Sequence, residues 1–173
     1  MLEMCFLHGL ESGPDGLKIR VMREAVESLG CTTQAPDFRF SRDPEARTSH
    51  LLDVLDDRHP RVLVGSSLGG FVAARATQRL AEAGRTLPIG LFLLCPAFDL
   101  AGYPLDRPAQ PLRGDAVFLV HGRHDTVVPL AHSRRAAEVW QAALLEVEDD
   151  HPLHASAGLI AAQLALFMRR LSP

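Results

Sequence analysis

The chain has 173 residues, of which 47% are hydrophobic and 23% are charged, and its formal net charge is -3. This length suits one domain, residues 1–173, with a buried core, and the hydrophobic content excludes a disordered chain. The basic residues are scattered, and the longest apolar runs are shorter than the about 20 residues of a bilayer span. We therefore expect neither a nucleic-acid partner nor a membrane association.

The first residues, "MLEMCFLHGL", lack the basic segment of a secretory signal. The cysteines Cys5, Cys31 and Cys95 are odd in number, and no CxxC spacing occurs, so they indicate buried reduced thiols rather than a disulfide framework or a zinc site. These observations favour a cytoplasmic protein without a metal ion.

Short apolar runs alternate with segments of helical periodicity along the chain. The runs predict strands over residues 2–7, 31–35, 61–65, 89–95, 116–121 and 144–147. Helices are expected between them, except in a proline-rich surface connection over residues 96–114. This order predicts an α/β fold: an open, mostly parallel sheet of about six strands in three layers, whose sites form beyond the carboxyl ends of the strands.

The segment Gly65-Ser66-Ser67-Leu68-Gly69 matches GxSxG between a predicted strand and a predicted helix. A nucleophilic serine at such a sharp turn has strained backbone angles, and the residues two before and two after it must be small. Ser67 is the candidate nucleophile, and the Leu68 N–H is a candidate oxyanion donor. The alternatives are an ordinary serine N-cap for Ser67 and a packing role for Ser66.

A carboxylate follows the fifth predicted strand in "FLVHGRHDTVVP". Asp125 is the candidate acid of a triad, with a turn or helix cap ahead of Pro129 as the alternative and Asp99 as the second choice. His121 and His124 flank Asp125 and are expected to shape its turn.

A candidate base lies in "LEVEDDHPLH", after the sixth predicted strand. We favour His151 over its competitor His154, which is expected at the surface of the next helix. The remaining histidines of polar segments are expected to be solvent-exposed: His50, His59 and His132. The order Ser67, Asp125, His151 is the order of α/β-hydrolase triads.

The loop after the first predicted strand begins with His8-Gly9 in "FLHGLESGPDGLK". A second backbone donor for an oxyanion must come from such a loop, and the Leu10 N–H is the candidate. Gly9 allows the backbone to approach the nucleophile.

These motifs identify the chain as similar to the α/β-hydrolase superfamily over nearly its full length. More narrowly, the opening resembles the "LHGxxSxPxxxK" of small bacterial YqiA-like esterases, although "DDHPLH" replaces their usual glycine-rich "GGxH". That resemblance implies no substantial lid, no cofactor, and a serine esterase with Ser67, Asp125 and His151 as its triad. The residues that carry it are Leu7, His8, Gly9, Ser12, Pro14 and Lys18.

Without a lid, the substrate is expected to be a small-molecule ester with a short acyl group, or an exposed ester, in a shallow cleft. Gly9, Phe98, Tyr103 and Val127 are the candidate substrate-binding residues, beside Leu10. The same triad would serve a thioesterase or an acyltransferase, and a non-catalytic binding module on the hydrolase fold is a further alternative. A dinucleotide site is excluded, because "GSSLGG" lacks the GxGxxG spacing and follows the third strand.

Overall fold

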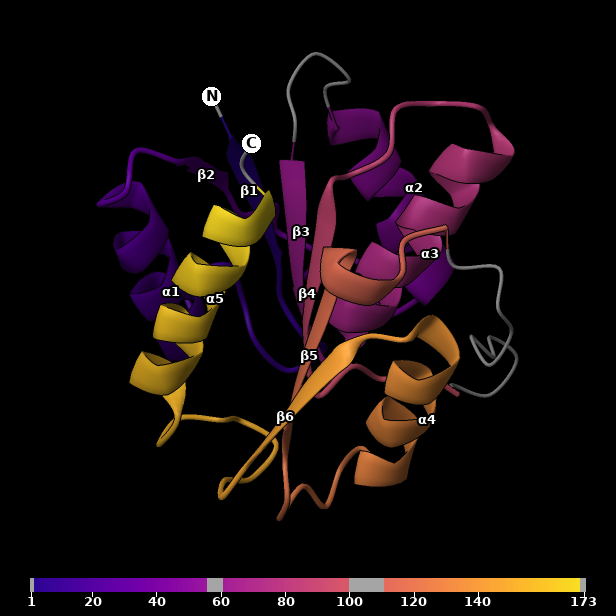
Figure 1. The fold of residues 1–173 in the computed structure, drawn as a ribbon. Helices are drawn as coiled ribbons and strands as arrows, with labels where there is room; N and C mark the ends of the chain where they lie inside the picture. Colours follow the sequence, from indigo (N-terminus) through magenta and orange to yellow (C-terminus); the bar gives the residue numbers. More distant parts are fainter. Residues whose placement is uncertain (1, 56–60, 100–110, 172–173) are drawn as a thin grey trace.

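The computed structural model describes residues 2–55, 61–99 and 111–171, and they form a parallel sheet between two layers of helices (Figure 1). The strands are β1 (Glu3–Leu7), β2 (Thr32–Gln34), β3 (Arg61–Ser66), β4 (Gly90–Leu94), β5 (Val117–Gly122) and β6 (Ala143–Val147). The helices are α1 (Leu17–Glu27), α2 (Pro44–Val54), α3 (Leu68–Glu82), α4 (Leu130–Trp140) and α5 (Ala157–Leu171), with a short 3-10 helix at Gly114–Ala116.

The sheet has the strand order β2-β1-β3-β4-β5-β6, and each neighbouring pair is parallel. All six predicted strands are confirmed, as are the open three-layer sheet and the alternation with helices. In the described ranges, the helices and strands are those of the sheet and its two helix layers, and none forms a cap domain. Within those ranges, no helix is both long and apolar enough to traverse a bilayer.

Alternating residues of the strands pack into two cores, one on each side of the sheet. Met4 and Phe6 of β1 pack with the core under α1 and α5, whereas Cys5 and Leu7 pack with the core under α2, α3 and α4. Because a parallel sheet is covered on both faces, its central strands are buried throughout, and all residues of β3 and β4 are buried. This explains why the strands appear in the sequence as continuous apolar runs.

The proline-rich connection differs from the expectation of a surface segment only at its start, since Pro111 and Arg113 at its other end are exposed as expected. Ala97 and Phe98 are buried directly after β4, and the Phe98 ring packs edge-on against Trp140 with 5.2 Å between the ring centroids. Aromatic side chains bury a large apolar area, and the burial of Phe98 therefore makes this end of the connection part of the core.

The order in which strands are added to the sheet reverses at β1. From β1 the chain adds β2 on one side, and it then crosses back to place β3 on the other side. The loops that leave the carboxyl ends of β1 and β3 therefore lead to helices on opposite faces of the sheet. Open α/β sheets form their sites in the crevice between two such loops. These two loops carry Gly9 and Ser67.

Candidate active site

The turn between β3 and α3 holds Ser67 in a strained conformation, with φ 54° and ψ -119°. Its side chain makes no capping hydrogen bond to α3, so the residue does not act as an ordinary serine N-cap. Main-chain contacts hold the turn: the Ser67 N–H donates to Leu94 O (2.9 Å), and its carbonyl accepts from the N–H of Gly70 (2.9 Å) and Ala97 (3.0 Å). Ser66 is buried at the end of β3, in agreement with a packing role.

The glycines on either side of Ser67 lie against backbone atoms. A Cβ on Gly65 would lie 2.7 Å from the Gly69 carbonyl carbon, and a Cβ on Gly69 would overlap Leu7 O and lie 2.5 Å from the Leu7 carbonyl carbon. The start of α3 therefore touches the end of β1 and the end of β3, and the small residues are needed for this close approach.

The substitution Gly69→Ala is expected to destabilise the protein by about 3 kcal/mol or more, because the methyl group meets backbone atoms of β1 that cannot rotate away. Urea unfolding would measure the change. Gly158→Ala is the matched control: a Cβ there has no atom within 4 Å, and alanine in α5 should leave the stability unchanged or raise it by about 1 kcal/mol. Equal stability of Gly69→Ala and the wild type would contradict this packing.

Asp125 and His151 meet at the carboxyl edge of β5 and β6. Asp125 Oδ2 accepts a hydrogen bond from His151 Nδ1 at 2.7 Å. Asp125 Oδ1 accepts from the backbone N–H groups of Val127 and Val128, both at 2.8 Å. The Asp125 side chain is fully buried, whereas that of His151 is 18% exposed. The carboxylate is thus fixed from behind, and the imidazole stands between it and the solvent.

The environment keeps Asp125 ionised. Burial raises the pKa of its carboxyl group, but the hydrogen bonds from the Val128 N–H and the His151 imidazole outweigh that effect and lower the pKa below its usual value. A carboxylate accepts only, so His151 carries its proton on Nδ1 and leaves an electron pair on Nε2. This is the tautomer that a general base for a serine hydroxyl needs.

A second histidine, His121, lies behind the carboxylate. It is fully buried, its Nε2 donates to Val128 O (3.0 Å) and lies 3.3 Å from Asp125 Oδ2, and its Nδ1 accepts from the Ser133 hydroxyl (2.7 Å). Burial lowers the pKa of His121, in keeping with a neutral ring. These contacts tie the start of α4 to the turn that holds Asp125, which agrees with the turn-shaping role expected for His121.

Cys95, His121 and Asp125 have candidate ligand atoms within 4.8 Å of one another. Burial raises the pKa of the Cys95 thiol to about 12, which keeps the thiol protonated beside the carboxylate. His121 already donates Nε2–H to a carbonyl, and both oxygens of Asp125 accept hydrogen bonds. The three groups therefore form a hydrogen-bonded cluster around the carboxylate.

The loop after β1 lies against the serine turn. A Cβ on Gly9 would lie 3.2 Å from Ser67 Cβ and 3.4 Å from Ser66 O, so only a residue without a side chain fits easily. Leu10 is half-buried next to it. Leu68 is the first residue of α3, and its N–H has no acceptor within the helix. The two candidate oxyanion donors thus belong to segments that meet at Ser67.

Asp99, the second acid candidate, is separate from this arrangement. Its Oδ2 lies 3.4 Å from His132 Nε2, and the side chains of Asp99 and His132 are 31% and 29% exposed. Asp125, not Asp99, hydrogen-bonds His151. His154 is exposed as expected, whereas His50 and His132 are half-buried, and His59 lies outside the described residues.

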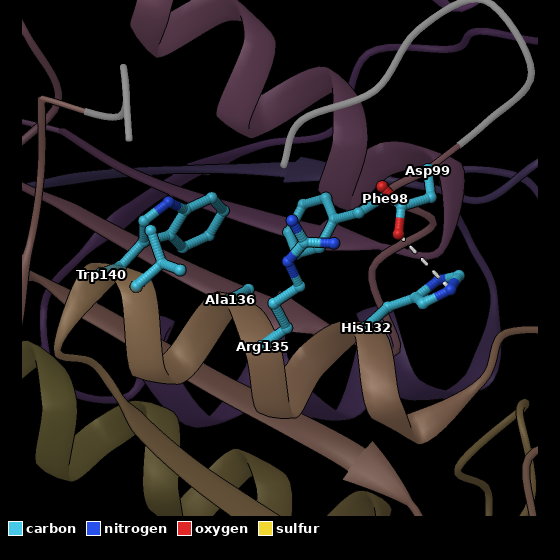
Figure 2. A pocket seen from close by; sticks show the side chains of 7 residues that line it. Phe98, Asp99, His132, Arg135, Ala136 and Trp140 are labelled. Atoms are coloured by element: carbon cyan, nitrogen blue, oxygen red, sulfur yellow. Dashed lines mark ion pairs between the residues drawn. The ribbon is translucent and has the colours of Figure 1, made fainter. Parts of the chain in front are cut away.

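A pocket of about 280 Å3, counted with its open mouth, lies between α4 and the loop after β4 (Figure 2). Phe98 and Trp140 form its apolar wall, and the Asp99–His132 pair lies at one end. Phe98 is 5% exposed and faces this pocket, whereas Val127 is 67% exposed. Tyr103 lies outside the described residues, and of the described side chains that line the pocket none belongs to Ser67, Asp125 or His151.

Solved structures have the same architecture. A protein from Xanthomonas campestris pv. campestris, assigned to the alpha/beta superfamily of hydrolases, matches with a TM-score of 0.80 and 28% identity over 97% of this chain and 98% of its own. Alpha/beta hydrolase domain-containing protein 10 from mouse matches with a TM-score of 0.79 and 21% identity over 98% and 90%. Est1E from Butyrivibrio proteoclasticus matches at 0.77 and 19% identity over 98% and 87%.

The fold is therefore that of an α/β-hydrolase, as the sequence motifs predicted. Within this class, the chain belongs to the Uncharacterised protein family (UPF0227), whose model matches residues 3–98. That range contains the His8-Gly9 loop and the Ser67 turn. Among curated proteins, none matches the chain significantly.

Proposed function

We propose that the protein is a serine hydrolase that cleaves carboxylic esters through Ser67, His151 and Asp125. The hydrogen bond from His151 Nδ1 to the buried Asp125 carboxylate carries this proposal, because it leaves the Nε2 electron pair available as a general base. The strained turn at Ser67, without a capping hydrogen bond, supports a nucleophilic role for its hydroxyl.

In the proposed reaction, Ser67 Oγ attacks the acyl carbonyl carbon while His151 Nε2 takes the hydroxyl proton. The Asp125 carboxylate stabilises the resulting imidazolium, and the N–H groups of Leu68 and Leu10 stabilise the oxyanion. His151 then gives the proton to the departing alcohol, which leaves an acyl group on Ser67. A water molecule, activated by His151, releases the acid and restores the hydroxyl.

The substrate class proposed is a small ester with a short acyl group or an ester exposed on a larger molecule. This rests on the fold, which has no cap domain in the described ranges. A thioester would be attacked in the same way, and an alcohol in place of water would make the reaction an acyl transfer.

Labelling with a fluorophosphonate tests the proposal. The phosphonyl group should add to Ser67 Oγ with loss of fluoride, and peptide mass spectrometry should locate the added mass on the peptide that contains this residue. The heat-denatured protein and Ser67→Ala are the controls and should carry no adduct. A folded wild-type protein that takes up no phosphonyl group at Ser67 would favour a non-catalytic binding module.

A further inference from the structure

Arg47 is a buried cation on α2 that the sequence motifs did not indicate. Arg47 is 1% exposed, and α2 begins at Pro44, directly after the cap residue Asp43. Arg47 Nε donates to Ser41 O (2.7 Å), and Nη1 donates to Gly9 O (3.2 Å). Burying a guanidinium costs free energy unless its donors are used. These two carbonyl contacts use two of its donors, and they raise the question of what a buried cation does at this place.

The Gly9 carbonyl also accepts a hydrogen bond from the preceding residue. His8 Nδ1 lies 2.7 Å from Gly9 O, and His8 Nε2 accepts from the Phe38 N–H at 2.8 Å. These partners fix the tautomer with the proton on Nδ1. Burial lowers the pKa of His8, in keeping with a neutral ring. Gly9 O is thus held by two donors, one charged and one neutral.

A planar trans peptide couples its two polar groups. The C=O of Gly9 and the N–H of Leu10 belong to one peptide plane and point in opposite directions. The donors from His8 and Arg47 hold the carbonyl, so they also set the direction of the Leu10 N–H. Gly9 itself lies against Ser67, since a Cβ placed on it would be 3.2 Å from Ser67 Cβ.

We propose that Arg47 is a positioning residue that fixes the Gly9–Leu10 peptide so that the Leu10 N–H points at the oxyanion formed on the Ser67 side. This inference rests on the proposed function. The planar guanidinium uses one nitrogen for Ser41 O and another for Gly9 O, which joins the segment before α2 to the oxyanion loop. A lysine carries its three donors on a single nitrogen, so it cannot reproduce the separation between the Nε and Nη1 donors of Arg47.

Two substitutions test the role of the Arg47 guanidinium. Arg47→Met removes the donors, and Arg47→Lys keeps the charge but not the paired geometry. Both are expected to lower kcat for a short aryl ester by roughly 10- to 100-fold with KM nearly unchanged, since a donor aimed only at the transition state is misplaced. If Arg47→Met does not fold, Arg47→Lys supplies the kinetic result.

Arg61→Met is the matched control. Arg61 is 3% exposed, and its two terminal guanidinium nitrogens have no hydrogen-bond partner among the described residues. It lies at the amino end of β3, opposite the proposed site. This variant should keep the wild-type kcat and KM. Equal losses in Arg61→Met and the Arg47 variants would mean that any buried arginine affects the rate through stability, which would overturn the inference.

A second measurement, the affinity for a boronic acid, separates a positioning role from a general loss of structure in the variants. An aryl boronic acid, which mimics the tetrahedral intermediate, should bind the Arg47 variants more weakly by the same factor as the loss in kcat/KM. The rate of fluorophosphonate labelling in the wild type tests the proposed function itself. Labelled wild type with unchanged kcat and boronate affinity in both Arg47 variants would refute the positioning role alone.

The crystal structure of Arg47→Lys decides the inference even if the wild type proves inactive. The Gly9–Leu10 peptide should be rotated relative to the wild type when the paired contact to its carbonyl is lost. An unchanged peptide orientation would overturn the role of Arg47, whereas an unlabelled but correctly oriented wild type would overturn the proposed hydrolysis.

Discussion

Replacing Ser67 with alanine is expected to lower kcat for short aryl esters by roughly 10⁶-fold, because the acyl-enzyme cannot form without the hydroxyl. The strained turn and the Leu68 and Leu10 N–H groups remain in this variant. Any residual rate should therefore come from oxyanion stabilisation and substrate positioning, which give about 10³- to 10⁴-fold over water. Rates on aryl esters of increasing acyl length, measured with purified wild type and variant, would show the difference.

Ser66→Ala is the control for this experiment. Ser66 ends β3, is buried, and lies on the same face of the sheet as Val62 and Val64, which pack into the core under α1 and α5. This variant should keep a wild-type kcat. Hydrolysis that survives undiminished in Ser67→Ala, or that disappears in Ser66→Ala with the fold intact, would contradict the assignment of the nucleophile.

The sequence predicted the elements and the order of the motifs because both are local signals. Apolar runs of five or six residues mark strands that are buried on both faces, and all six were located within one or two residues. The glycines beside Ser67 were identified by a steric argument that the Leu7 contact of Gly69 bears out. The sequence favoured Asp125 over Asp99 although both follow the end of a strand, and in the structure it is Asp125 that hydrogen-bonds His151.

Distant contacts made by residues outside the motifs could not be predicted. Arg47 belongs to a polar helical segment, and nothing in its neighbours indicates that its guanidinium reaches the Gly9 carbonyl 38 residues earlier. For the contact of His121 with the Asp125 carboxylate, the sequence offers only a weak indication, which is a histidine within a buried strand. Phe98 was expected to border a cleft and it lines the pocket beside α4, but its packing on Trp140 depends on the position of α4. In each case tertiary packing decides.

The substitution Asp125→Asn is expected to lower kcat by about 10⁴-fold with little change in KM, through the tautomer of His151. The backbone N–H groups of Val127 and Val128 require an acceptor, so the asparagine oxygen should remain at the Oδ1 position. The amide NH2 group then takes the Oδ2 position and faces His151 Nδ1. Two donors cannot share a hydrogen bond, so the imidazole must move its proton to Nε2.

A proton on Nε2 removes the electron pair that would accept the Ser67 hydroxyl proton, so the variant should fold but fail as a general base. Its kcat would be compared with that of Asp99→Asn, which alters the carboxylate next to His132 and should leave the rate unchanged. Thermal unfolding would verify that both variants are folded. If Asp99→Asn lost the rate and Asp125→Asn kept it, the acid would have to be reassigned. We expect Asp125→Asn to lose the rate and Asp99→Asn to keep it. Because asparagine keeps the size and shape of the aspartate side chain and changes only which atom donates, this result would show that Asp125 acts by holding one tautomer of His151.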